Sequence, residues 1–138
     1  MSTNVGSVMT KNPVTIKAGD SLLMATRVLK EKGFKHLPVL DESGAVVGVV
    51  TDRDLKRASA SDATTLEVHE LLYLLDKVKI EQVMNRKPQT IKVTDDVQDA
   101  AKLMVERKIG CLPVLEGDKV AGIVTKDDLL RLVARSGV

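Results

Sequence analysis

The chain has 138 residues, of which 43% are hydrophobic and 29% are charged, and its formal net charge is +2. This length fits one domain or two small halves, and the composition supports an ordinary packed core. Scarce aromatic residues and the lack of a basic stripe disfavour nucleic-acid binding, which uses exposed rings and clustered cations. No apolar run is long enough to span a membrane, and the only cysteine, Cys111, leaves no intrachain disulfide. We therefore expect a soluble cytoplasmic protein without DNA or membrane partners.

The first half of the chain predicts a β-α-β-β-α succession. The β-branched run PVTIK at residues 13–17 predicts a strand, and Asp20-Ser21 predicts the cap of a helix that ends at a glycine. The runs HLPVL and AVVGVV predict two strands joined by the turn DESG, and a second helix begins at TDRD, residues 51–54. Strands this apolar are typical of sheets that are covered on both faces.

The middle of the chain, residues 61–80, combines a small polar loop with a leucine-rich helix. Thr64 and Glu67 have the spacing of a capping box that opens this helix. Its broad apolar face contains Leu71, Leu72, Leu74, Leu75 and Val78. Such a face either covers the protein's own sheet or forms a contact between subunits.

The second half of the chain repeats the first. VMTKNPVTIKAGD aligns with VMNRKPQTIKVTD at an offset of 75 residues, and GVVTDRDL aligns with GIVTKDDL at an offset of 74. Two repeats bury a shared core better than one. We expect an α/β (α+β) fold of two β-α-β-β-α repeats packed with pseudo-two-fold symmetry. The predicted segments are 1–60 for the first repeat, 61–80 for the loop and helix, and 81–138 for the second repeat.

Each repeat carries the pattern T-x-x-D where a strand turns into a helix, at Thr51–Asp54 and Thr125–Asp128. One interpretation is a capping box, which needs no ligand. The other is a sugar-phosphate site, because a helix N-terminus and a threonine hydroxyl suit a phosphate. Arg53 or Lys126 would then add a cation, and the aspartate would accept hydrogen bonds from ribose hydroxyls.

These duplicated motifs, together with HLPVLDESGAVVGVVTDRDL, resemble a tandem cystathionine-β-synthase-type (CBS) domain pair, also called a Bateman module. The resemblance covers nearly the whole chain and implies a regulatory module that binds AMP, ADP, ATP, NAD or S-adenosylmethionine in clefts between the repeats. It implies adenine slots beside the first strand and the LPV strand of each repeat, and unequal affinities because His36 faces one slot and Cys111 the other. The candidate ligand-binding residues are Val14, Thr15, Lys35, His36, Leu37, Pro38, Thr51, Arg53 and Asp54 in the first repeat, and Gln89, Thr90, Gly110, Cys111, Leu112, Pro113, Thr125, Lys126 and Asp128 in the second.

The same resemblance predicts a homodimer and an unidentified regulated protein. The leucine-rich middle segment is similar to that of acetoin-utilisation proteins, which often carry a further C-terminal sensor domain, and we expect a stand-alone module without that domain. No catalytic motif is found, so we expect a non-enzyme with no required cofactor, whose nucleotide binds with or without magnesium. His36 and Cys111 occupy equivalent positions in different repeats and do not predict a metal or redox pair. The alternative function is a structural dimerisation or scaffold module without a small-molecule ligand.

Overall fold

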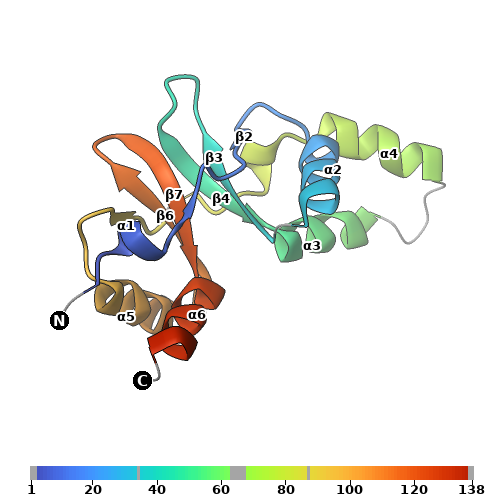
Figure 1. Cartoon of the computed structure of the whole chain (residues 1–138). Helices are drawn as coiled ribbons and strands as arrows, with labels where there is room; N and C mark the ends of the chain where they lie inside the picture. The colour runs from blue at the N-terminus through green and yellow to red at the C-terminus, as the bar shows by residue number, and fades with distance from the viewer. Residues whose placement is uncertain (1–2, 34, 63–67, 87, 137–138) are drawn as a thin grey trace. The chain divides into compact units, whose positions relative to one another are not determined.

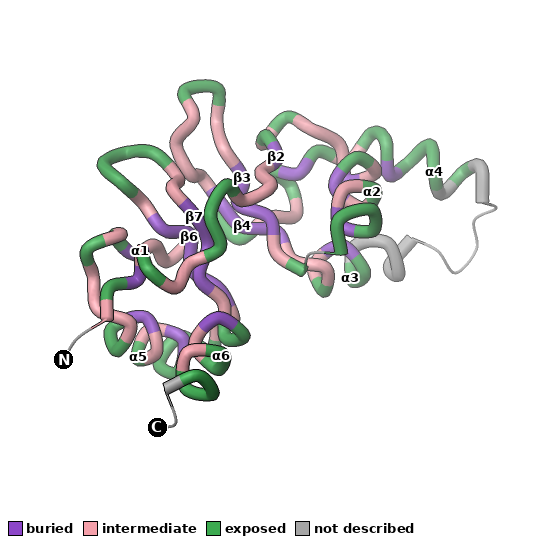
Figure 2. The backbone as a smooth tube through the Cα atoms, in the orientation of Figure 1, coloured by how far each residue is buried: buried purple, intermediate pink, exposed green. Residues whose placement is uncertain are grey.

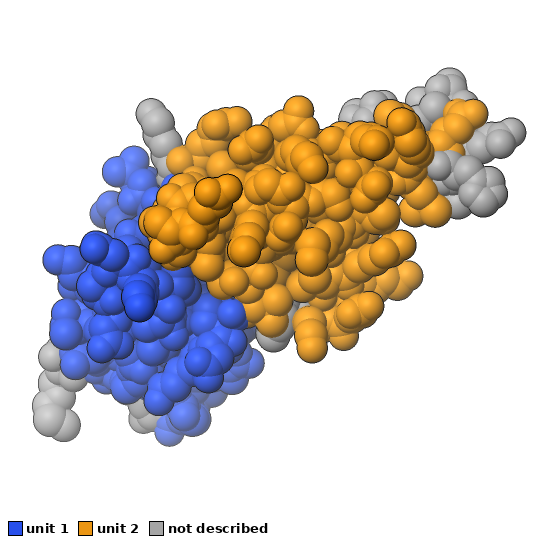
Figure 3. Space-filling model, turned by 90° about the horizontal axis from the view of Figure 1, so that it is seen from above, with its two compact units in different colours: residues 1–13, 88–138 blue, residues 14–87 orange. Residues whose placement is uncertain are grey.

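The computed structural model describes residues 3–33, 35–62, 68–86 and 88–136 (Figure 1). The chain forms two compact units, one made of residues 1–13 and 88–138 and the other of residues 14–87 (Figure 3). Within the described ranges, no helix has both the length and the apolar character needed to cross a bilayer.

The unit of residues 14–87 holds the first repeat and the middle segment. Its three-stranded sheet has the order β2-β3-β4, in which β2 is parallel to β3 and β3 is antiparallel to β4. The elements in chain order are β2 (Ile16–Lys17), α2 (Leu22–Lys32), β3 (His36–Leu40), β4 (Val46–Thr51), α3 (Asp52–Asp62), α4 (Val68–Lys77) and the 3₁₀ turn Ile80–Gln82.

The other unit repeats this arrangement and adds a strand from the N-terminus. Its sheet has the order β1-β7-β6-β5, with β5 parallel to β6 and the other pairs antiparallel. The elements are α1 (Val5–Val8), β1 (Thr10–Lys11), β5 (Ile91–Lys92), α5 (Val97–Arg107), β6 (Cys111–Glu116), β7 (Lys119–Thr125) and α6 (Lys126–Ser136). The predicted mixed α/β fold of two β-α-β-β-α repeats is confirmed, although the first strand of each repeat has only two residues.

The helix caps follow from the sequence. Ser21 Oγ accepts a hydrogen bond from the Met24 amide at 3.1 Å, and α2 ends at Gly33 with a φ of 72°. In the second repeat, Asp96 Oδ1 accepts from the Gln98 amide at 2.8 Å, and Lys108 takes the left-handed position with a φ of 56°. A left-handed residue at this position lets the last turn close on its own carbonyls, which glycine does at least cost.

Each unit buries its own aliphatic core between the sheet and two helices (Figure 2). In residues 14–87 the core contains Ile16, Leu22, Ala25, Leu29, Leu37, Val39, Val50, Leu55, Leu75 and Ile80. In the other unit it contains Val5, Ile91, Ala100, Met104, Leu112, Val114 and Val124. Alternate residues of β3 and β6 therefore point inward, as period-two strands require.

Helix α4 packs on helices α2 and α3 of its own unit. Leu75 is buried in the core and Val78 packs against it, whereas Leu72, Tyr73 and Leu74 remain exposed. The buried part of this face thus packs on helices α2 and α3 and joins the core of its own unit, as one interpretation expected. Thr64 and Glu67 lie outside the described residues, and so does the side chain of Leu71.

In each repeat, the short segment that precedes the first strand pairs with the last strand of the hairpin in the same unit. Thr10 pairs with Ile123, and Asn85 pairs with Val49. The sequence segments 1–60, 61–80 and 81–138 follow the internal repeat rather than these contacts, so their boundaries stay a prediction.

Glycines in β4 and β7 make room for this pairing. A Cβ on Gly48 would lie 2.6 Å from Met84 Sδ and 2.8 Å from the Asn85 carbonyl oxygen. A Cβ on Gly122 would meet Met9 Sδ at 2.6 Å and the Thr10 carbonyl oxygen at 2.7 Å. A strand glycine often marks a close backbone approach, and the repeated VM segments explain why it recurs here.

We predict that Gly48→Ala lowers the free energy of unfolding by about 1–3 kcal/mol, because the methyl group overpacks against backbone. Gly19→Ala is the matched control, since nothing lies within 4 Å of its added Cβ. The control should change stability by less than about 1 kcal/mol. Urea denaturation of both variants measures the effect, and equal stabilities would contradict the close approach.

Candidate ligand-binding sites

The strand-to-helix junctions β4–α3 and β7–α6 both close with a capping box. The Thr51 amide donates to Asp54 Oδ2 at 3.0 Å, and the Asp54 amide donates to Thr51 Oγ1 at 3.1 Å. The corresponding distances at Thr125 and Asp128 are 2.9 and 3.3 Å. The capping interpretation of T-x-x-D therefore holds at both ends, and any ligand must meet these groups while they cap a helix.

Capping leaves few donors for a phosphate in the first turn of α3. The Asp52 amide donates to the Lys35 carbonyl at 2.9 Å, just as the Lys126 amide donates to the Gly110 carbonyl at 3.1 Å. Within the described residues, no hydrogen bond engages the Arg53 amide, and Thr51 Oγ1 only accepts. A phosphate could thus bind one amide and one hydroxyl there, beside the exposed Arg53 side chain.

The register of each hairpin brings a second candidate residue beside each threonine. His36 pairs with Thr51, and Cys111 pairs with Thr125. Because the neighbouring amide-to-carbonyl bonds already join Asp52 to Lys35, the His36–Thr51 pair is of the non-hydrogen-bonded kind, whose side chains lie closest. His36 therefore lies beside Thr51, and Cys111 beside Thr125, each pair within its own unit.

The prolines of the two LPV strands end the parallel pairing. The Ala18 amide donates to the Leu40 carbonyl and the Val93 amide to the Leu115 carbonyl, which sets the register. In this register Pro38 lies opposite Thr15 and Pro113 opposite Thr90, and an N–H at positions 38 and 113 would be needed to donate to the Val14 and Gln89 carbonyls and extend the ladder. Proline has no N–H, so β2 and β5 stop at two residues each.

The remaining candidates line this interrupted edge. Val14, Thr15, Gln89 and Thr90 are half-buried just before β2 and β5. Leu37, Pro38, Leu112 and Pro113 are fully buried, and the two leucines point into the cores, so these residues offer backbone groups rather than apolar side chains to a ligand. Lys35, Arg53 and Lys126 are exposed cations next to the junctions, and Gly110 is half-buried.

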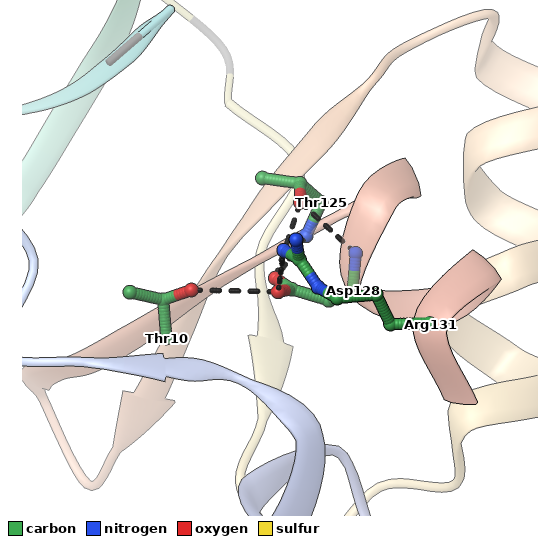
Figure 4. A network of polar contacts seen from close by, with 4 residues as sticks. All are labelled: Thr10, Thr125, Asp128 and Arg131. Atoms are coloured by element: carbon green, nitrogen blue, oxygen red, sulfur yellow. Dashed lines mark hydrogen bonds and ion pairs between the residues drawn. The ribbon is translucent and has the colours of Figure 1, made fainter. Parts of the chain in front are cut away.

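The two aspartates of the T-x-x-D motifs differ in their surroundings. Asp54 is half-buried, and its carboxylate bonds only to the Thr51 amide among the described residues. Asp128 is 6% exposed, and its carboxylate also contacts Thr10 and Arg131 (Figure 4). The sequence analysis did not identify Thr10 or Arg131. Thr10 lies on β1, the strand that pairs with β7, and Arg131 lies one helical turn after Asp128 on α6.

Cys111 is a buried thiol without a redox partner, because it is the only cysteine in the chain. Burial raises the pKa of this thiol to about 12. In the part of the chain that the structure describes, no cluster of three or more His, Cys, Asp or Glu residues could hold a metal ion.

The fold and the duplicated motifs define a tandem domain pair, and the comparison with known proteins agrees. The family described as CBS domain matches residues 5–61 and 80–135, so the chain belongs to the CBS domain family and carries two copies of its domain.

Relatives occur both as similar-sized proteins and as parts of enzymes. A CBS domain-containing protein of Dictyostelium discoideum is 35% identical over 98% of this chain and 94% of its own length. A homoserine O-acetyltransferase of Methanococcoides burtonii is 33% identical over 95% of this chain but only 24% of the enzyme. The chain thus spans a small part of such enzymes.

Three solved structures show the same fold. The CBS domain pair of protein MJ0100, in complex with 5′-methylthioadenosine and S-adenosyl-L-methionine, has a TM-score of 0.83 and 29% identity and covers 99% of both chains. CBSX2 in complex with AMP has a TM-score of 0.79 and 29% identity over 98% of both chains. The acetoin utilisation protein AcuB from Vibrio cholerae, at 24% identity and a TM-score of 0.80, covers 99% of this chain and 93% of its own, and shows likeness of fold alone.

We predict that the stability contributed by the neutral Cys111 thiol is complete below pH 9 and is lost as pH rises toward 12. Burial raises the pKa of the folded thiol from its ordinary value of 9.0, so the unfolded chain loses its proton first. The loss amounts to about 1.4 kcal/mol per pH unit in this window. Urea denaturation of wild type and Cys111→Ala between pH 8 and 10.5 measures the difference, and parallel pH profiles would contradict it.

Proposed function

We propose that this chain is a regulatory module that binds an adenosine-containing ligand at its T-x-x-D junctions. The observation that carries the proposal is the β4–α3 junction, where a threonine hydroxyl, a helix amide and a half-buried carboxylate share one surface. Two neighbours of the same fold were solved with adenosine compounds, namely protein MJ0100 and CBSX2. Their ligands support the class of compound for this chain, and not one particular nucleotide.

The first junction offers each part of a nucleotide a chemically matched group. The Thr51 hydroxyl and the Arg53 amide would donate to phosphate oxygens, with the Arg53 side chain as a cation beside them. The second oxygen of Asp54 would accept hydrogen bonds from the ribose hydroxyls while the first still caps the helix. At the second junction Thr125 and Asp128 hold the aligned positions, whereas Arg53 aligns with Asp127 and the neighbouring cation is Lys126.

The base would lie along the interrupted strand edge. Because Pro38 ends the ladder, backbone groups of Val14 and Thr15 are left beside β3, where an adenine needs both donors and acceptors. The second repeat offers Gln89 and Thr90 beside Cys111, Leu112 and Pro113. Lys35 and Gly110 carry the carbonyls that hold the first helical residue of α3 and α6.

We propose binding rather than catalysis, because both motif aspartates already accept hydrogen bonds as caps and are poor general bases. AMP, ADP, ATP, NAD and S-adenosylmethionine are the candidate ligands, and a triphosphate would bind with or without magnesium. A ligand that favours one conformation would change the affinity for a regulated protein by linkage. The cytoplasmic location stays a prediction.

We predict that Asp54→Asn weakens AMP binding about 10- to 100-fold, because the amide loses the charge that strengthens hydrogen bonds from the ribose hydroxyls. The amide oxygen can still accept from the Thr51 amide, so the helix cap survives. Asp52→Asn is the matched control on the same first turn, where the carboxylate pairs with Lys56 at 3.0 Å.

Thermal shift and calorimetric titration with AMP, ATP and S-adenosylmethionine provide the measurement. A ligand at 100 times its Kd stabilises the native state by about 2.7 kcal/mol. Equal affinities of wild type and Asp54→Asn would remove the ribose assignment. A wild type that binds none of the three ligands would instead favour the scaffold function.

The scaffold function has its own support in the unit that contains α5 and α6. A groove of about 430 Å³ lies between these helices, bordered by Val105 and Leu130. Val105 is 78% exposed, Leu130 65% and Val133 47%. The first repeat has polar residues at the aligned positions, namely Lys30, Lys56 and Ser59. An apolar surface that the first repeat lacks at the aligned positions supports a contact with a second copy, which would remove it from water.

We predict that Leu130→Glu shifts a homodimer toward monomer, because each copy would then bury a carboxylate in the contact. Lys30→Glu, on the exposed face of α2, is the charge-matched control. Light scattering coupled to size-exclusion chromatography measures the mass of each variant. A dimer that persists in Leu130→Glu would place the contact elsewhere, and a monomeric wild type would exclude the homodimer.

A further inference from the structure

The two T-x-x-D junctions differ in what already occupies the carboxylate. We propose that Thr10 and Arg131 close the β7–α6 junction to ribose, so that each chain binds one adenosine ligand, at the β4–α3 junction. This inference rests on the proposed function and specifies it. It concerns the partners of Asp128, which the T-x-x-D pattern by itself does not reveal.

Every acceptor position of the Asp128 carboxylate is in use (Figure 4). Oδ2 accepts from the Thr125 amide at 2.9 Å and from the Thr125 hydroxyl at 3.2 Å. Oδ1 accepts from Thr10 Oγ1 at 3.4 Å and from Arg131 Nη2 at 3.1 Å. A carboxylate has about four lone-pair positions, so a ribose diol must displace one of these donors.

The threonine of the same junction is also engaged. The Thr125 hydroxyl accepts a hydrogen bond from the Asp128 amide at 3.3 Å and donates one to the Asp128 carboxylate. A hydroxyl has one hydrogen, so it has none left for a phosphate oxygen. Both the sugar contact and the phosphate contact proposed for this motif are therefore satisfied from within the chain.

The first junction lacks both of these restraints. Asp54 keeps Oδ1 without a partner among the described residues, and the Thr51 hydroxyl accepts without donating. Arg57 aligns with Arg131 in the repeat, yet it is exposed and forms no ion pair that the structure shows within those residues. The residue that aligns with Thr10 is Asn85.

Burial makes the closure persistent. Asp128 is 6% exposed, whereas the Arg131 side chain is 67% exposed and reaches back over it from the next turn of α6. A buried carboxylate that loses its cation is left uncompensated, so a ligand gains little by displacing Arg131. Thr10 lies on β1, and its pairing with Ile123 of β7 fixes the position of the residue beside Asp128.

Calorimetric titration with AMP tests the inference through stoichiometry. At AMP concentrations that just saturate wild type, we expect one AMP per chain for wild type, none for the more weakly binding Asp54→Asn, and one for Asp128→Asn. Arg131→Gln combined with Thr10→Val should reveal a second equivalent, bound at least about tenfold more tightly than any second event in wild type. The same pair of changes in an Asp54→Asn background should restore one equivalent, at the β7–α6 junction.

Three controls separate opening of the site from loss of fold. Arg131→Lys keeps a cation and should keep one equivalent, and Arg135→Gln removes an exposed cation of α6 that does not contact Asp128. Circular dichroism melting of the unliganded variants verifies that each one folds. Two comparable equivalents in wild type, or one equivalent in the folded double variant, would overturn the closure while leaving the proposed function intact. No AMP binding by wild type or by any variant would overturn both.

Discussion

The reciprocal hydrogen bonds between a threonine and the aspartate three residues later hold the end of each hairpin to the helix that follows. The strand stops there because the threonine amide donates to a side chain and not to a neighbouring strand. The helix starts there because the threonine oxygen takes one of its orphan amides, which contributes about 1 kcal/mol in typical proteins. Core packing on β3 and β6 and the position of every candidate ligand group depend on this change of direction.

Backbone requirements explain most of what recurs between the two halves. The strand glycines admit the sulfur of Met84 or Met9 and the carbonyl that follows it. The prolines remove the donor that would have lengthened the parallel pairs, and so they keep an edge of β3 and β6 uncovered. These constraints act on the frame of each unit, whereas side chains that face a ligand or solvent are free to differ. His36 and Cys111 differ in this way although they hold the same register beside a threonine.

Local sequence patterns predicted the hairpin turns, the helix caps and the T-x-x-D junctions, because each of these features depends on residues within four positions of one another. It did not predict that Thr10 would pair with β7, since that contact joins residues more than a hundred positions apart. The one indication in the sequence was Gly122, because a glycine inside a strand often marks the close approach of another backbone segment. The contact of Arg131 with Asp128 was not predictable either, because an arginine one turn along a helix pairs with an aspartate only when burial makes the pairing favourable.

Burial also explains why the same T-x-x-D motif can differ in its role between the two repeats. A carboxylate that caps a helix at a half-buried site, as Asp54 does, remains hydrated on its second oxygen, and a ribose hydroxyl replaces water there at little cost. A carboxylate that is almost fully buried must find protein donors for both oxygens, because unpaired charge away from water is expensive. With protein donors on both oxygens, the Asp128 carboxylate stabilises the unit whose helix it caps. Duplication therefore supplies two similar frames, and under the proposed function the solvent exposure of one side chain in each frame decides whether the carboxylate is available to a ligand or is used by the fold.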